Sequence, residues 1–235
     1  MKKIYFLLLA TILIASCKPG SKTNNRSEGK PVITVTLEPL RYLTEAIAGD
    51  RFTVVSMVPK GTSPETYDPT PQQLVELARS KAYFRIGYIG FEQTWTDKLT
   101  DNAPHLQFFD MSQGVDLIYD NTHVHHHAAN EKEHQHAIGV EPHIWNSAVN
   151  AQIIAGNILS ALRNIDKGNE DFYLERYNTL CRKIEHTDSL IRQTLATPGA
   201  DHAFMIYHPA LSYFARDYGL HQIPIEAGGK EPSPA

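Results

Sequence analysis

The stretch from Asn169 to Leu195 reads NEDFYLERYNTLCRKIEHTDSLIRQTL and contains neither proline nor glycine. One set of its side chains recurs at spacings of three and four residues, the period of one face of an α-helix. These residues are Tyr173, Tyr177, Leu180, Ile184, Thr187, Ile191 and Leu195. At 1.5 Å per residue such a helix is about 40 Å long, more than a small domain requires. We therefore predict that residues 168–197 form a strut between two lobes, with a coiled-coil interaction helix as the alternative.

Before this helix, the chain alternates between short β-branched or aromatic runs and helical patterns, as α/β domains do. Thr70, Pro71 and Gln73 supply an N-cap, a proline at the first helical position and the return bond of a capping box, so a helix should run from there to about Arg79. The predicted strands are Val32–Leu37, Phe52–Val58, Tyr83–Tyr88 and Leu106–Phe109, and the further helices are Leu40–Ala48, Phe91–Leu99 and Ser147–Ile165. Residues 31–167 should thus form an N-terminal α/β lobe.

A second lobe is expected to begin after Pro198 and Gly199, within residues 198–235. Its predicted elements are a strand at Ala203–Tyr207, a helix at Pro209–Tyr218 and a strand at Gln222–Ile225. Two strands and one helix do not enclose a hydrophobic core, which indicates a fragment or a product truncated within this lobe. The predicted fold is α/β, with two Rossmann-like lobes bridged by one long α-helix and the second lobe incomplete.

The first residues have the pattern of an export signal. Residues 1–16 carry Lys2 and Lys3, then an apolar run and small residues, and they are too short to span a membrane. LIASC, ending at Cys17, resembles a bacterial lipobox, in which the cysteine is acylated; an ordinary signal peptide with an incidental cysteine is the alternative. Residues 17–30 should then be a flexible tether to a lipid anchor. We expect no disulfide, because Cys181 has no partner and should be a small buried side chain.

Charge and motifs exclude several classes of function. Loss of Lys2 and Lys3 with the signal peptide leaves 20 basic against 26 acidic residues, a net charge of about −6, which argues against nucleic acid as a partner. The sequence contains no HExxH, no serine or cysteine nucleophile motif and no glycine-rich phosphate loop. We therefore expect no catalysis.

Histidines are concentrated in the second half of the chain. His143 lies in EPHIW, and His208 follows a predicted strand and precedes Pro209, where the ligands of open α/β sheets gather. Residues 121–138 are predicted to form a mobile loop that carries His123, His125, His126, His127, His134 and His136. Imidazole is the commonest protein ligand for zinc, so the pattern predicts a protein that handles a transition metal. A solvated insert without a role is the alternative for the loop, and a capping or core histidine is the alternative for His208.

Three motifs carry a family resemblance. SPETYDPTP at 63–71, EPHIW at 141–145 and IYHPALSYFARDYG at 206–219, with the histidine-rich loop and the long helix between them, resemble the cluster A-I solute-binding proteins of zinc and manganese ABC importers. The resemblance implies two lobes with a metal ion between them, held by four side chains. Carried over by motif, the ligands are Glu65, His143 and His208, and the fourth lies beyond Ala235. Glu141 is then a carboxylate that orients the His143 ring.

Glu65 departs from the family pattern, which has a histidine there. A carboxylate is a harder donor than imidazole, which makes manganese the alternative ion. Zinc remains the expected ion, because nitrogen and oxygen sites generally bind zinc more tightly than manganese. If Glu65 is only an exposed carboxylate, the site is lost or shifted.

The resemblance implies a high-affinity zinc-binding lipoprotein, monomeric and anchored on the periplasmic or cell-surface face of the bacterial envelope, which delivers metal to an ABC permease. The alternatives are a histidine-rich metal buffer or adhesin-type lipoprotein, and a zinc hydrolase with Glu141 as its base.

Overall fold

The computed structural model describes residues 29–64, 66–119 and 139–226. The first lobe is built on a four-stranded parallel sheet in the order β2-β1-β3-β4. Its strands are β1 (Val32–Val35), β2 (Thr53–Ser56), β3 (Ala82–Arg85) and β4 (Gln107–Asp110). β1 and β2 lie within predicted strands, and β3 and β4 overlap predicted strands. The direction in which successive strands are added to the sheet reverses between β1 and β3. The predicted α/β class is confirmed.

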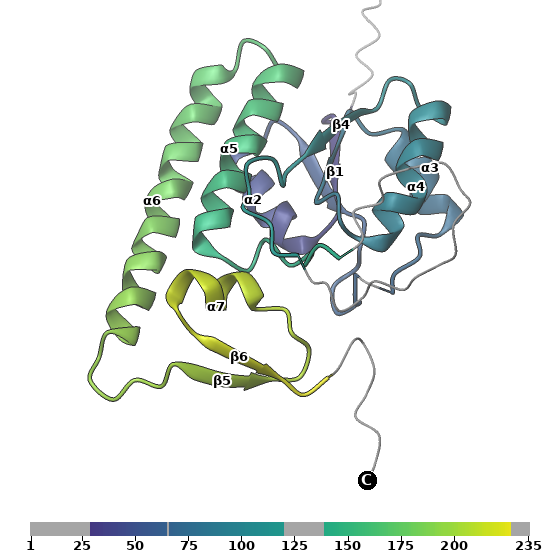
Figure 1. Cartoon of the computed structure of the whole chain (residues 1–235). Helices are drawn as coiled ribbons and strands as arrows, with labels where there is room; N and C mark the ends of the chain where they lie inside the picture. Colours follow the sequence, from purple (N-terminus) through teal and green to yellow (C-terminus); the bar gives the residue numbers. More distant parts are fainter. Residues whose placement is uncertain (1–28, 65, 120–138, 227–235) are drawn as a thin grey trace, which may run out of the picture.

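Helices cover both faces of this sheet. The elements α2 (Glu38–Ala48), α5 (Ala148–Ile165) and α6 (Glu170–Leu195) pack on one another on one side, and α3 (Pro71–Ala78) and α4 (Gly90–Asn102) lie on the other (Figure 1). The core between the layers includes Ile33 and Phe84 of the sheet and Ile47, Ile154 and Ile158 of the helices, all fully buried. A parallel sheet buried on both faces favours such continuous apolar strands.

The predicted capping box at the start of α3 is present. The Gln73 backbone N–H donates to Thr70 Oγ1 at 3.3 Å, and the Thr70 N–H donates to Gln73 Oε1 at 3.0 Å. Pro71 occupies the first turn, where no amide hydrogen is needed.

The long helix α6 has 26 residues and runs from the first lobe to the second (Figure 1). Tyr173 and Leu180 are buried against α2 and α5, whereas Ile184 and Ile191 further along are half-buried at an open groove of about 300 Å³. Cys181 was predicted to be buried, but it is half-buried because it lies beside the packed stripe rather than in it. The predicted strut is confirmed. No helix in the described ranges is long and apolar enough to cross a membrane.

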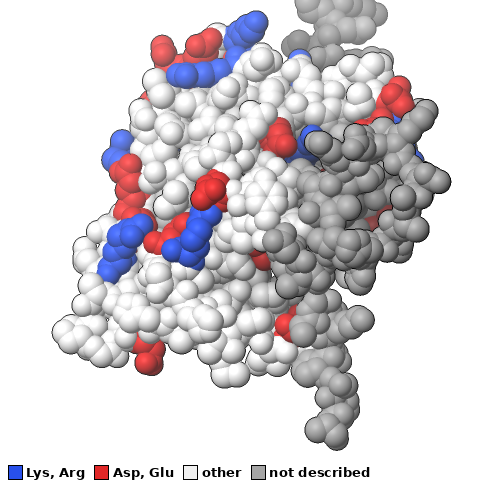
Figure 2. Space-filling view, viewed as in Figure 1, with Lys and Arg blue, Asp and Glu red and all other residues white. Residues whose placement is uncertain are grey.

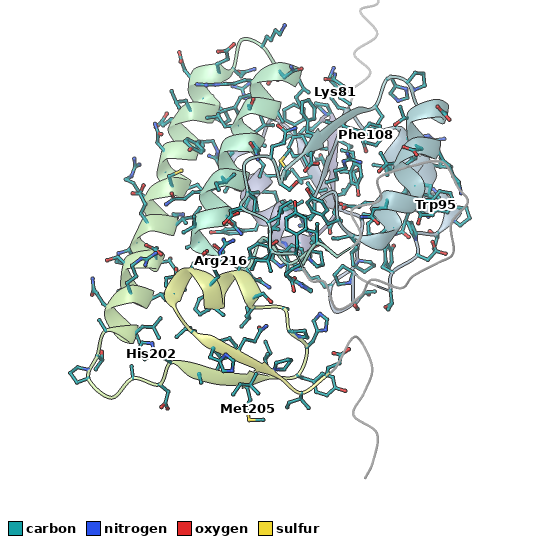
Figure 3. The ribbon with its side chains drawn as sticks, in the orientation of Figure 1. Lys81, Trp95, Phe108, His202, Met205 and Arg216 are labelled. Carbon is teal, nitrogen blue, oxygen red and sulfur yellow. The ribbon has the colours of Figure 1, made fainter. Side chains whose placement is uncertain are left out.

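The described part of the second lobe consists of β5 (Ala203–Ile206), α7 (Ser212–Tyr218) and β6 (His221–Pro224). The two strands are parallel, and α7 crosses over between them. The helix begins at Ser212 and not at Pro209 as predicted, because the chain first makes a tight turn in which the Ala210 N–H donates to the His208 carbonyl at 2.7 Å. Figure 3 shows Arg216 of α7 at the junction with the first lobe, and Met205 on the outer face of the two strands.

Charges are mixed on the face of the molecule shown in Figure 2, where basic and acidic side chains lie side by side. Ion pairs among the described residues include Arg192 with Asp188 at 2.9 Å and Arg216 with Asp217 at 2.8 Å. Over the described residues in this view, neither sign forms a broad patch of the kind that attracts nucleic acid.

Candidate metal centre

His143 lies in the segment that leads into α5. The neighbouring Ile144 is fully buried, and its carbonyl accepts a hydrogen bond from Asn150 Nδ2 at 3.0 Å. Ser147 caps α5 by accepting from the Asn150 backbone N–H at 3.1 Å. The His143 ring is thus held by an anchored loop, and the residue is only 5% exposed.

His208 comes from the other lobe, two residues after the end of β5. Its side chain is 34% exposed, so it has access to solvent that His143 lacks. The position agrees with the expectation that ligands gather at the carboxyl ends of parallel strands.

The two imidazoles meet at the junction of the lobes. His143 Nε2 and His208 Nε2 are 3.3 Å apart, with the ring planes inclined at 71°. Two nitrogens that each lie about 2.0–2.1 Å from one zinc ion at tetrahedral angles are roughly 3.3 Å apart. The spacing is therefore that of two ligands of a single ion.

The other nitrogen of each ring contacts a carboxylate. His143 Nδ1 lies 2.5 Å from Glu141 Oε1, and His208 Nδ1 lies 3.1 Å from Glu226 Oε2. A neutral ring that donates from Nδ1 presents the lone pair of Nε2, and here the two Nε2 atoms face one another. Such an arrangement favours a cation between them, and carboxylates behind metal-ligating histidines are a general feature of metal sites.

Glu141 is fixed by both lobes. Besides the His143 ring, its carboxylate accepts from the His143 backbone N–H at 2.9 Å and from Ser212 Oγ of α7 at 3.3 Å. Burial alone would raise the pKa of Glu141, but the hydrogen bonds from the ring and backbone N–H of His143 and from Ser212 outweigh it, so the pKa lies below its ordinary value. Glu141 is therefore an anion able to orient the His143 ring.

Glu226 was missed in the sequence. It is 18 residues from His208, and the parallel register that pairs Ile206 with Pro224 continues to bring these two residues together. The only sequence indication of Glu226 was that it follows the second of two predicted neighbouring strands, which ends at the same edge of their sheet as the strand before His208. The register itself is not readable without the structure.

Several predicted site residues lie outside the described residues. These are Glu65, Cys17 and the loop histidines His123, His125, His126, His127, His134 and His136. Within the described ranges, no three histidine, cysteine or acidic side chains are arranged so that they could hold a metal ion. The described part of the site is thus a pair of histidines with a carboxylate behind each.

The fold consists of two α/β lobes joined by a single long helix, and one histidine of each lobe lies at their junction. This architecture is that of a two-lobe substrate-binding protein. Residues 33–235 match the family described as "Zinc-uptake complex component A periplasmic", ZnuA. The protein belongs to this family.

The similar proteins are transport proteins for metals, but their names specify different metals. The chain is 26% identical to the high-affinity zinc uptake system protein ZnuA of Bacillus subtilis, over 99% of this chain and 73% of that protein. It is 28% identical to the manganese ABC transporter substrate-binding lipoprotein PsaA of Streptococcus mitis, over 94% of this chain and 70% of that protein. A crystal structure of ZnuA superposes with a TM-score of 0.76 at 36% identity, covering 87% of this chain and 75% of that one.

Proposed function

We propose that this protein is the zinc receptor of an ABC importer, a lipoprotein that binds Zn²⁺ outside the cytoplasm and delivers it to the permease. That it is a metal-binding substrate-binding protein follows from its family. The observation that favours zinc over other ions is the pair of imidazole nitrogens 3.3 Å apart at the junction of the lobes. Nitrogen donors bind zinc more tightly than manganese.

The proposed ligands are His143, His208 and Glu65, with Glu141 and Glu226 orienting the two rings. Because each lobe supplies one histidine, a bound ion links the lobes and favours the arrangement in which both rings converge. A receptor recognised by its permease needs such a difference between loaded and empty forms. This role needs no open coordination position and no general base, in contrast to a zinc hydrolase.

Manganese is the second candidate. It is favoured by Glu65, where the family has a histidine, and by the manganese receptors among the similar proteins. A site with fewer imidazoles and more carboxylates suits manganese better than the usual zinc set does.

The binding test uses the full mature chain in competition with a chromophoric chelator. We expect one tight site that Zn²⁺ occupies in preference to Mn²⁺, because two of its donors are imidazoles. A preference for Mn²⁺ would select the second candidate. Several weak sites of similar affinity would indicate a histidine-rich buffer and contradict the receptor.

The lipid anchor is a separate proposal, resting on Cys17 directly after the small residues of the lipobox. Mass spectrometry of membrane-extracted protein should find a diacylglyceryl-modified Cys17 at the mature N-terminus. Cys17→Ser should remain unmodified. A mature N-terminus at any other residue contradicts this proposal and leaves metal binding untouched.

A further inference from the structure

Helix α7 belongs to the second lobe, yet its first turn is inserted into the first. Tyr213 is fully buried there. Its hydroxyl donates to the Glu141 carbonyl at 2.8 Å and accepts from the Ile118 backbone N–H at 3.2 Å. Burial raises the pKa of Tyr213 to about 12, so the hydroxyl remains a donor well above neutral pH.

The two partners of this hydroxyl are adjacent segments of the first lobe. The Glu141 N–H donates to the Ile118 carbonyl at 2.9 Å, and Tyr119 and Val140 form an antiparallel bridge beside them. One tyrosine of the second lobe thus holds together the segment that contains Ile118 and the segment that carries His143.

The same turn holds Glu141 at two points. Tyr213 binds its carbonyl, and the neighbouring Ser212 donates to its carboxylate at 3.3 Å. Glu141 in turn holds the His143 ring. Because Tyr213 follows His208 by five residues, a short chain of contacts connects the two ligands: His208, the first turn of α7, Glu141 and His143.

We propose that Tyr213 is a positioning residue whose hydroxyl sets the placement of His143 relative to His208 across the two lobes. The inference rests on the proposed function, because it assigns a role in metal binding at that site. The binding pair must be held at the spacing that one ion requires, and misplaced supporting groups typically weaken metal sites 10–100-fold.

Removal of the hydroxyl should not detach α7. The ring of Tyr213 stays buried in Tyr213→Phe, and other contacts still join α7 to the first lobe. Arg216 Nη1 donates to the Asp116 carbonyl at 2.6 Å, Asn146 Nδ2 donates to the Ala210 carbonyl just before α7 at 2.9 Å, and Ser147 donates to Asp217. Tyr213→Phe should therefore disturb the position of Glu141 more than it disturbs the packing of the two lobes.

Tyr218→Phe is a matched control on the same helix. Tyr218 is also largely buried, and its hydroxyl donates to Asp188 Oδ1 of α6 at 2.7 Å rather than to Glu141. Its loss removes one tyrosine hydroxyl bond that anchors α7, but none that reaches Glu141.

The test compares full-length wild type, Tyr213→Phe and Tyr218→Phe by zinc affinity, by thermal unfolding and by the visible absorption of bound Co²⁺, which reports ligand geometry. We expect Tyr213→Phe to weaken zinc binding about 10-fold and alter the Co²⁺ spectrum. Tyr218→Phe should leave both unchanged while lowering the unfolding temperature. Ser212→Ala leaves the Tyr213 hydroxyl in place and removes the bond to the Glu141 carboxylate, together with the bonds of the Ser212 hydroxyl to the Pro209 carbonyl and from Gln222 Nε2. It should act in the same direction as Tyr213→Phe and serves if that variant does not fold.

Equal affinities and spectra for wild type, Tyr213→Phe and Ser212→Ala would overturn the positioning role alone. Equal losses of zinc affinity in Tyr213→Phe and Tyr218→Phe would also overturn it, because the loss would then reflect lower overall stability and not the position of His143. A wild type without a tight site overturns the proposed function first, and this inference with it.

Discussion

Replacement of either His143 or His208 with alanine is expected to lower zinc affinity by roughly 100-fold. Zinc sites with four protein ligands are worth about 10–16 kcal/mol, so one ligand accounts for about 3 kcal/mol, or roughly 100-fold. Each replacement also leaves a carboxylate, Glu141 or Glu226, without the ring it contacts. Chelator competition with the two single variants and the double variant measures the loss.

His202→Ala is the matched control, since His202 is an exposed histidine of the same lobe as His208 and away from the junction (Figure 3). It should bind zinc like the wild type. A chain without residues 123–136 should lose only weak binding. Loss of the tightest site in that deletion, with normal binding by His143→Ala and His208→Ala, would show that the ligands are misassigned.

Loss of the Glu92 side chain is expected to cost the largest amount of stability. Glu92 is 1% exposed and accepts from the backbone N–H groups of Ile86 at 2.9 Å, Gly87 at 2.7 Å and Ile89 at 3.3 Å. It also accepts from the hydroxyl of Thr36. It thereby ties the loop after β1 to the loop after β3, where the order of the sheet reverses.

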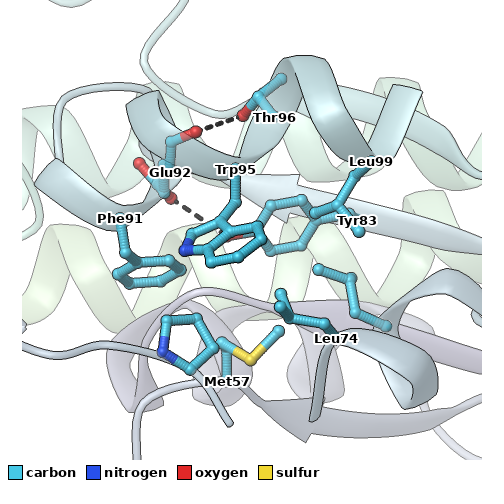
Figure 4. A pocket seen from close by; sticks show the side chains of 10 residues that line it. Met57, Leu74, Tyr83, Phe91, Glu92, Trp95, Thr96 and Leu99 are labelled. Atoms are coloured by element: carbon cyan, nitrogen blue, oxygen red, sulfur yellow. Dashed lines mark hydrogen bonds between the residues drawn. The ribbon is translucent and has the colours of Figure 1, made fainter. Parts of the chain in front are cut away.

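The space around Glu92 offers little compensation. Figure 4 shows it beside Trp95, Phe91 and Tyr83, at a cavity of about 10 Å³, which is room for about one water molecule. Glu92→Ala leaves buried donors without acceptors, at about 1–3 kcal/mol for each group. We expect a loss of roughly 3–5 kcal/mol, or about 10 °C in the unfolding temperature.

Urea and thermal unfolding of Glu92→Ala, Glu92→Gln and Glu76→Ala test this expectation. Glu92→Gln should be intermediate, because one amide oxygen remains while the amide NH₂ replaces an acceptor. Glu76 is an exposed carboxylate of α3, so its loss should change stability by less than about 0.5 kcal/mol. Equal stabilities of Glu92→Ala and Glu76→Ala would contradict the role of Glu92.

The pH dependence gives a second measurement on the same variants. Burial raises the pKa of Glu92 above its ordinary value, against the lowering effect of the Thr36 hydroxyl and the three backbone amides. A raised pKa in the folded state means that stability is greatest where the group is protonated and falls as the pH rises through that pKa. The stability difference between wild type and Glu92→Ala should therefore shrink as the pH rises.

Much of the fold could be predicted because its signals are local. The capping box at Thr70 and the spacing of three and four along α6 depend on residues within one or two turns of each other. The ends of helices and strands were predicted less accurately. The start of α7 moved from Pro209 to Ser212 because the turn after His208 uses a backbone hydrogen bond that composition does not indicate.

The candidate site was only partly predictable. His143 and His208 were found through motifs that resemble a family, since 65 residues separate them and neither has a local signature of metal binding. Glu141 was within reach of sequence reasoning because it is two residues from His143. Glu226 was not, because its contact with His208 depends on how two strands align.

Sequence alone was enough to predict which segments become helices and strands, that a long helix separates two α/β lobes, and that histidines are the candidate metal ligands. These properties depend on periodicity, capping and donor chemistry, which act over short distances along the chain. The 3.3 Å distance between the two Nε2 atoms and the hydrogen bond from Tyr213 to Glu141 across the lobes are properties of the folded structure. These contacts follow from strand register and from the packing of α7 against the first lobe, which join residues remote in sequence.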